Sequence, residues 1–197
     1  MVDYSIAAIP TEYQGRMYRS RLEARWAAFF DRLSWNAEYE PFDLGAWSPD
    51  FLLRDLNVLV EVKPLITFDG GTWDKMVTAC LERKLFAGAT PISGILLTLL
   101  APQLTKQKVV RLGWLLAADD GDTTPLKAFL GWLPIEDRPA WYADVIGLLP
   151  MSPHGCWFSM SDEGGLFQPN DRIPATYGIY GMELWAQACA AVQYHPE

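Results

Sequence analysis

The segment Val58-Leu59-Val60-Glu61-Val62-Lys63 constrains the fold most, because it combines β-branched residues with two charges and stops at Pro64. Such a run is typical of a strand in the middle of a sheet. Alternation along a strand places Leu59, Glu61 and Lys63 on one face and the three valines on the other. Because an unpaired buried charge is strongly unfavourable, Glu61 and Lys63 must contact each other, a metal ion or a ligand.

A partner strand is expected just upstream, where Pro49-Asp50 opens an extended segment that runs through Leu53. Residues 54–57 are polar and typical of a turn, so the two segments are predicted to form a hairpin. Asp50 then lies near Glu61. Two neighbouring carboxylates repel each other unless a cation lies between them, and carboxylate oxygens suit Mg²⁺ or Mn²⁺.

The flanking sequence predicts an α/β protein with a mixed central sheet flanked by helices. Apolar residues at positions 22, 26, 29, 30 and 33 predict an amphipathic helix from residue 15 to residue 33. A second helix is expected from a cap at Thr72 to about Ala87. The other expected elements are strands over 37–41, 90–100 and 109–117 and a last helix over 178–193.

The charge of the chain is unevenly distributed along its length. The formal net charge is −8, from 24 acidic and 16 basic side chains, which by itself argues against binding to nucleic acid. Residues 119–197 hold 11 acidic and 3 basic side chains, however, whereas residues 1–118 hold 13 of each. Five arginines between positions 16 and 32 accompany only two acidic residues there. One basic and one acidic surface are therefore compatible with the overall charge.

The composition also indicates where a chain of this kind resides. No apolar run is long enough to span a membrane, and no basic region precedes an apolar one near residue 1, so neither a membrane partner nor a secretory signal is expected. The three cysteines are widely spaced and odd in number, which favours reduced thiols. We therefore predict a cytoplasmic protein.

The combination Pro49-Asp50 … Glu61-Val62-Lys63 resembles the signature of the PD-(D/E)XK nuclease superfamily, which has a restriction-endonuclease-like mixed sheet flanked by helices. The expected order of a helix, a hairpin carrying the motif, a helix and a strand matches that family's common core. Residues 11–44 look more narrowly like small nucleases of phages and mobile elements, through segments such as Tyr18-Arg19-Ser20-Arg21-Leu22-Glu23 and Tyr39-Glu40-Pro41. The resemblance covers about residues 11–100.

The resemblance implies a Mg²⁺-dependent nuclease acting on DNA, with Mn²⁺ able to substitute. Asp50 and Glu61 would hold the metal, with the Val62 carbonyl as a third ligand, and Lys63 would position or activate the attacking water. Glu23 matches the family's helical acidic residue, which binds the metal through water or holds a second ion. The side chains expected to contact the nucleic acid are Arg16, Arg19, Arg21 and Lys75.

Two other interpretations remain open at this point. Glu61 and Lys63 are equally explained by a structural ion pair on the strand. The chain could also be a catalytically silent nuclease-fold module that binds a protein partner through its acidic C-terminal region. We divide the chain into a nuclease-like core, residues 1–118, and an acidic, tryptophan-rich extension, residues 119–197, packed on that core. A homodimer is compatible with cutting two strands.

Overall fold

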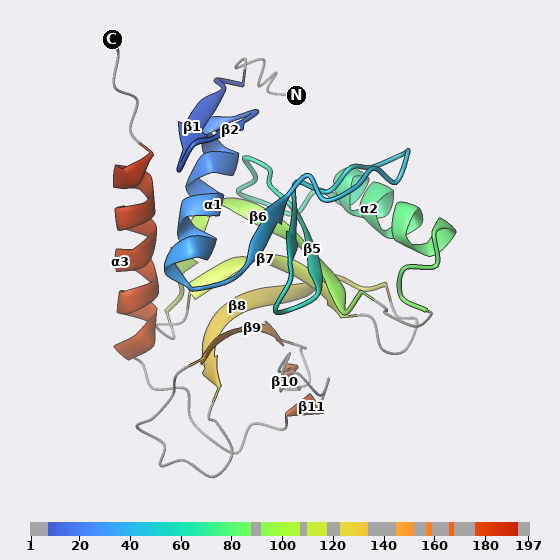
Figure 1. Cartoon of the computed structure of the whole chain (residues 1–197). Coiled ribbons are helices and arrows are strands. Elements are labelled where there is room, and N and C mark those ends of the chain that lie inside the picture. The colour runs from blue at the N-terminus through green and yellow to red at the C-terminus, as the bar shows by residue number, and fades with distance from the viewer. Residues whose placement is uncertain are drawn as a thin grey trace.

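A computed structural model describes residues 8–87, 92–106, 110–117, 123–133, 145–151, 157–158, 166–167 and 176–192. Within these residues, three helices flank a mixed β-sheet, so the predicted α/β class is confirmed (Figure 1). None of the helices described is long and apolar enough to cross a lipid bilayer.

The main sheet has nine strands, and their spatial order follows their order in the chain. The strands are β3 (Ala37–Tyr39), β4 (Phe51–Leu53), β5 (Val58–Glu61), β6 (Gly94–Leu104), β7 (Val110–Ala117), β8 (Leu126–Leu133), β9 (Val145–Met151), β10 (Trp157–Phe158) and β11 (Leu166–Phe167). All neighbours pair antiparallel except β5 and β6, which are parallel. A parallel pair needs a crossover connection, and helix α2 (Gly70–Glu82) provides it.

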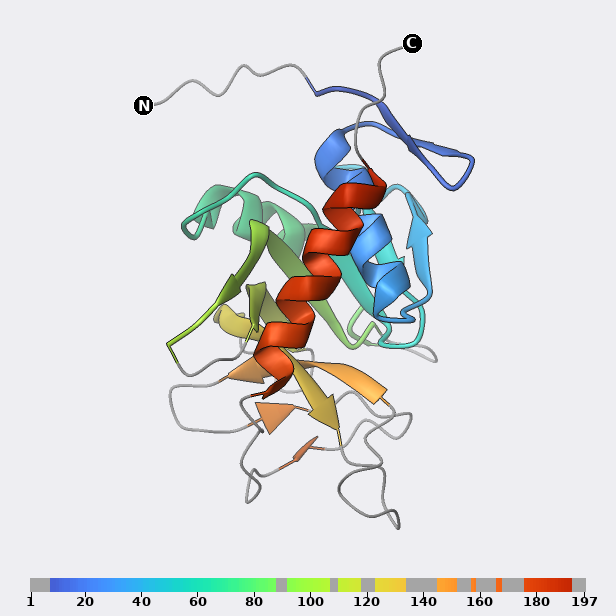
Figure 2. The same ribbon diagram turned by 90° about the vertical axis from the view of Figure 1, so that its left-hand side faces the viewer.

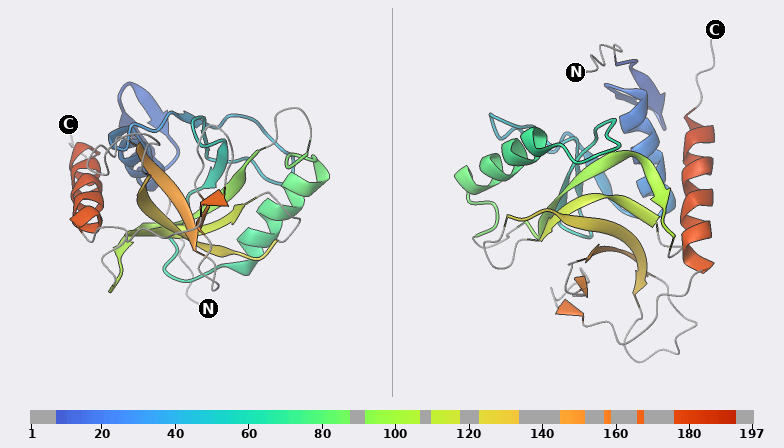
Figure 3. Two further views of the ribbon diagram at one scale, coloured as in Figure 1. Left: turned by 90° about the horizontal axis from the view of Figure 1, so that it is seen from below. Right: turned by 180° about the vertical axis from the view of Figure 1, so that it is seen from behind.

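The helices cover the two faces of the sheet. Helices α1 (Arg21–Arg32) and α3 (Thr176–Ala191) lie side by side on one face, and α2 covers the other (Figures 2 and 3). Val58 and Val60 belong to the core on the α1 side, whereas Leu59 belongs to the core beneath α2. The predicted alternation along β5 is therefore confirmed, and it directs Glu61 to the α2 side.

Helix α1 begins at Arg21, so our expectation of a helix from residue 15 is wrong. A hairpin of β1 (Thr11–Tyr13) and β2 (Arg16–Tyr18) precedes it, with Gln14 and Gly15 at φ of 49° and 75° in the two-residue turn. Ser20 then caps the helix, because its side chain accepts a hydrogen bond from the Glu23 N–H. Apolar spacing identifies the buried face of a helix, but the capping residue decides where the helix starts.

Other boundaries also differ from expectation. Helix α2 is capped by Asp69, not Thr72, and ends at Glu82, not near Ala87. The Asp69 carboxylate accepts from the Gly71 N–H at 3.2 Å and from the Thr72 hydroxyl at 2.6 Å. Strand β3 stops two residues before Pro41, and β5 stops at Glu61, leaving Lys63 beyond the strand. The expected strands over 90–100 and 109–117 correspond to β6 and β7, and the last helix to α3, although residues 90, 109 and 193 are outside the described part.

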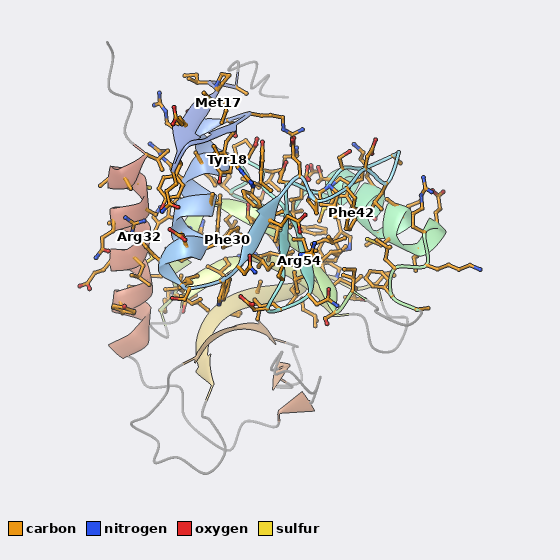
Figure 4. All side chains as sticks on the ribbon, viewed as in Figure 1. Met17, Tyr18, Phe30, Arg32, Phe42 and Arg54 are labelled. Carbon is orange, nitrogen blue, oxygen red and sulfur yellow. The ribbon has the colours of Figure 1, made fainter. Side chains whose placement is uncertain are left out.

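Elements from beyond residue 118 join the same sheet and core. Strand β8 pairs with β7, and the ring of Trp185 on α3 lies 5.1 Å from that of Trp26 and 5.5 Å from that of Phe29 on α1. In Figure 4, Phe30 lies between α1 and the sheet, whereas Met17 lies on the projecting β1–β2 hairpin. The division at residue 118 stays a prediction, and many side chains of residues 119–197 are outside the described part.

Candidate functional site

The β4–β5 hairpin brings Asp50 and Glu61 together. Phe51 pairs with Val60 in the sheet, and the Asp50 N–H donates to the Val60 carbonyl at 2.9 Å, so Asp50 stands opposite Glu61. The two residues are only 3% and 6% exposed. The predicted juxtaposition of these carboxylates is therefore confirmed, and it lies at the end of β5 nearest Pro64.

Asp50 is held through both of its carboxylate oxygens. Its Oδ2 accepts from the Val62 N–H at 2.7 Å, and its Oδ1 pairs with the Arg19 guanidinium. Burial, followed by repulsion from Glu61, outweighs the Val62 hydrogen bond and raises the pKa of Asp50 to about 7. The ionised form of Asp50 is thus costly in this environment, and additional positive charge would stabilise it.

Glu61 also has a separate partner for each oxygen. The Trp47 indole Nε1–H donates to Oε2 at 2.7 Å, and the Lys63 Nζ lies 2.7 Å from Oε1. Burial alone would lower the pKa of the Lys63 ammonium, but the Glu61 charge outweighs burial and leaves that pKa raised. The ion pair expected for Glu61 and Lys63 is therefore formed, and Lys63 remains a cation.

Glu23 has a local structural role. Its Oε1 accepts from the Ser20 hydroxyl at 2.8 Å while its N–H donates to Ser20 Oγ at 3.1 Å, so two hydrogen bonds link Ser20 and Glu23 at the start of α1. Its Oε2 accepts from the Tyr39 hydroxyl at 2.5 Å. Burial, together with this hydrogen bond, raises the pKa of Tyr39 to about 12. Both Glu23 oxygens are thus engaged by hydroxyl groups.

Arg19 connects the carboxylates at the start of α1. Besides its pair with Asp50, its Nε lies 3.0 Å from Glu40 Oε1 and 3.7 Å from Glu23 Oε2. Burial opposes the charge of Arg19, but the Tyr39 hydroxyl and then the charges of Asp50 and Glu23 raise its pKa. The guanidinium is therefore bound among carboxylates, where the sequence predicted only a contact with phosphate.

A cleft of ≈ 280 Å³ opens onto this cluster. Three of the side chains that line the cleft are cations, those of Arg19, Lys63 and Lys75, and one is the carboxylate of Glu61. The loop before β4 forms much of the remaining wall through Gly45, Ala46, Trp47 and Ser48. Lys75 reaches the cleft from α2. Arg16 and Arg21, which were also expected to contact nucleic acid, are not among its lining residues, so their predicted role stays a prediction.

The oxygen donors of the site bear on whether it can hold a divalent ion. No three acidic, histidine or cysteine side chains converge closely enough to hold a metal within the part of the chain that the structure describes. Glu23, for which the resemblance implies a bond to the metal through water or to a second ion, does not form such a group with Asp50 and Glu61, and Arg19 lies against both Glu23 and Asp50. Asp50 and Glu61 alone still supply the hard oxygen donors that suit Mg²⁺. Coordination by the Val62 carbonyl stays a prediction.

Sequence reasoning missed several residues that hold the site, of which Trp47, Tyr39 and Ser20 are the clearest. The Ser-x-x-Glu spacing at Ser20 was a readable signal for the start of the helix. Tyr39 and Trp47 meet their carboxylates from loops and strands far along the chain, so no local pattern marks them.

Comparisons with protein-family models, curated proteins and solved structures give no match to this chain. Its functional interpretation therefore depends on the geometry of the site.

Proposed function

We propose that this protein is a Mg²⁺-dependent nuclease of the PD-(D/E)XK type that hydrolyses phosphodiester bonds in DNA. The observation that carries the proposal is the pair of buried carboxylates, Asp50 and Glu61, set opposite each other where β4 and β5 meet a cleft lined by cations. The order α1, β3, β4, β5, α2, β6 is also the order that the resemblance implies for the restriction-endonuclease-like core.

The charge balance of the cluster supports a divalent ion. Among the described residues, four carboxylates, those of the buried Glu23, Asp50 and Glu61 and of the half-exposed Glu40, are linked by close contacts to two cations, Arg19 and Lys63. With every group ionised, the cluster has two negative charges in excess. Carboxylates this poorly neutralised resist burial unless a further cation joins them.

Each residue then has a distinct task. A bound Mg²⁺ would supply Lewis-acid stabilisation of charge on the phosphate oxygen and a water of lowered pKa. Lys63, held as a cation by Glu61, reaches the cleft and is placed to orient the attacking water and to offset negative charge in the transition state. The Trp47 N–H fixes the orientation of Glu61. Lys75 and Arg19 line the same cleft, where they can contact phosphates next to the scissile bond.

Cleavage assays on single-stranded, duplex and branched DNA and on RNA, with Mg²⁺ or Mn²⁺, test this proposal. Lys63→Ala and Asp50→Ala should each lower the rate by roughly 10²-fold or more, because each removes charge stabilisation in the transition state. Lys106→Ala, which removes an exposed lysine that is not among the cleft residues, is the matched control and should cut as wild type does.

Equal activity of wild type and Lys63→Ala on every substrate would refute a catalytic role for the site. If wild type cuts nothing but the whole chain forms a stable complex with a protein, the silent binding module is favoured instead. The predicted partner surface within residues 119–197 and the predicted homodimer stay predictions.

A further inference from the structure

Arg19 occupies the position between the cleft and Asp50. Asp50 is 3% exposed and is not among the cleft residues, whereas Arg19 lines the cleft and pairs with Asp50 Oδ1. The other oxygen of Asp50 is engaged by the Val62 N–H. The partner of Oδ2 is thus a backbone group, whereas the partner of Oδ1 is a side chain, which can change its rotamer. A cation that enters through the cleft meets Arg19 before it meets Asp50.

We propose that Arg19 is an exchangeable counter-ion: it neutralises Asp50 when no divalent ion is bound, competes with that ion for Asp50 Oδ1, and turns onto a phosphate of the substrate when displaced. This inference rests on the proposed function, because it requires both a metal ion and a phosphodiester substrate at the site.

The structure holds the main chain of Arg19 and leaves its side chain half exposed. Its backbone N–H donates to the Tyr39 hydroxyl at 3.0 Å, directly before the Ser20 cap of α1, so the main chain is held. The side chain is 55% exposed, although its partner Asp50 is buried. A long side chain with half of its surface in solvent can change its partner without disturbing the core.

The chemistry of the guanidinium requires such an exchange. Arginine cannot be deprotonated at ordinary pH, so a divalent ion at Asp50 would face a full positive charge unless Arg19 moves away. The planar guanidinium binds carboxylate and phosphate with the same two-pronged geometry. The cleft that Arg19 lines is where the substrate phosphates would lie, and displacement therefore transfers the cation from one anion to another.

Calorimetric titration with Mn²⁺ tests the competition. Arg19→Gln should bind Mn²⁺ roughly three- to tenfold more tightly than wild type, since the ion no longer displaces a partly exposed ion pair. Two controls separate this effect from a simple loss of charge. Lys75→Gln removes a cation from the same cleft. Arg54→Gln removes an arginine that is 54% exposed and paired with Glu38, but at the opposite end of β4 from Asp50 (Figure 4). Arg54→Gln should keep the wild-type affinity, and Lys75→Gln, which removes a charge but no partner of Asp50, should tighten binding less than Arg19→Gln does.

Several results would overturn the competition. If wild type binds Mn²⁺ and Arg19→Gln binds it no more tightly, or if Lys75→Gln tightens binding equally, Arg19 does not compete for Asp50, while the proposed metal site survives. If neither wild type nor Arg19→Gln binds Mn²⁺, the metal site fails and this inference fails with it. Binding by Arg19→Gln alone would support the competition in its strongest form.

The transfer to phosphate needs a second readout. In a Lys63→Ala background, which is expected to slow cleavage by roughly 10²-fold or more, fluorescence anisotropy with labelled single-stranded and duplex DNA is measured in EDTA and in Mn²⁺. Arg19→Gln should weaken binding about threefold or more in Mn²⁺ and little in EDTA, because Arg19 is engaged with Asp50 when no ion is bound. An equal loss under both conditions, or no loss under either, would contradict the exchange.

Discussion

Replacing Trp47 with phenylalanine removes the one N–H group that the indole donates to Glu61. The hydrogen bond from Nε1 to Oε2 is 2.7 Å long, and both residues are buried, with Trp47 3% and Glu61 6% exposed. Phenylalanine retains an aromatic ring in the buried cluster beneath α2, so the change is directed at one oxygen of Glu61.

The magnitude follows from the charge of the acceptor. A hydrogen bond to a charged group contributes about 1.5–3 kcal/mol to the free energy of unfolding, against about 0.5–1.5 kcal/mol for a neutral one. Trp73 provides the neutral comparison: it is also 3% exposed, belongs to the same core, and donates from Nε1 to the Thr123 carbonyl at 3.1 Å. Because both Trp→Phe changes remove the same volume, Trp47→Phe should cost about 1 kcal/mol more than Trp73→Phe.

Urea unfolding at neutral pH in EDTA measures both variants against wild type. An excess of about 1 kcal/mol corresponds to a further fall of about 2–4 °C in Tm for a chain of this size. If Trp47→Phe destabilises the protein no more than Trp73→Phe does, the indole does not stabilise the Glu61 carboxylate, and its assigned role in orienting Glu61 is refuted.

Two further predictions concern the charge of Asp50 and the packing of the sheet. The pKa of Asp50 is raised from 3.8 to about 7 in the folded protein, so the folded state binds this proton more tightly than the unfolded state does. In EDTA, the free energy of unfolding should therefore fall as pH rises from about 4 to about 7, and Asp50→Asn should flatten this pH dependence. If urea unfolding gives the same pH dependence for Asp50→Asn as for wild type, the raised pKa does not belong to Asp50. Gly113→Ala should destabilise the protein by about 1–3 kcal/mol, because a Cβ there meets the Leu97 carbonyl oxygen and lies 3.0 Å from the Thr98 Cα, and a Tm equal to that of wild type would contradict this.

The sequence was most informative where local chemistry decides the structure. Alternation in Val58–Lys63 correctly assigned the faces of β5, and the polar turn before it placed Asp50 near Glu61. Apolar spacing found α1 but not its first residue, because the Gln14-Gly15 turn and the Ser20 cap interrupt the segment before the helix begins. Spacing reports which face is buried, and it carries little information about boundaries.

The electrostatic arrangement could not be read from the sequence in the same way. Arg19 was expected to contact phosphate as one of several arginines, yet it pairs with a carboxylate 31 residues away. That pair depends on how α1 lies against the β3–β4 edge, where Tyr39 holds both the Arg19 N–H and Glu23. Which arginine of a basic stretch meets a carboxylate is thus a property of tertiary structure.

The cluster around Asp50 is difficult to explain as a device for stability alone. A buried ion pair seldom contributes more than apolar residues of the same volume would, and this cluster has two more carboxylates than cations. Burial, and after it repulsion from Glu61, raises the pKa of Asp50. If the cluster were structural, Asp50→Asn would lower the free energy of unfolding. If the cluster is a cation site, Asp50→Asn should raise the free energy of unfolding of the metal-free protein near pH 7, and Mn²⁺ should no longer bind. A gain in stability together with a loss of ion binding is the combination that a structural ion-pair network does not predict.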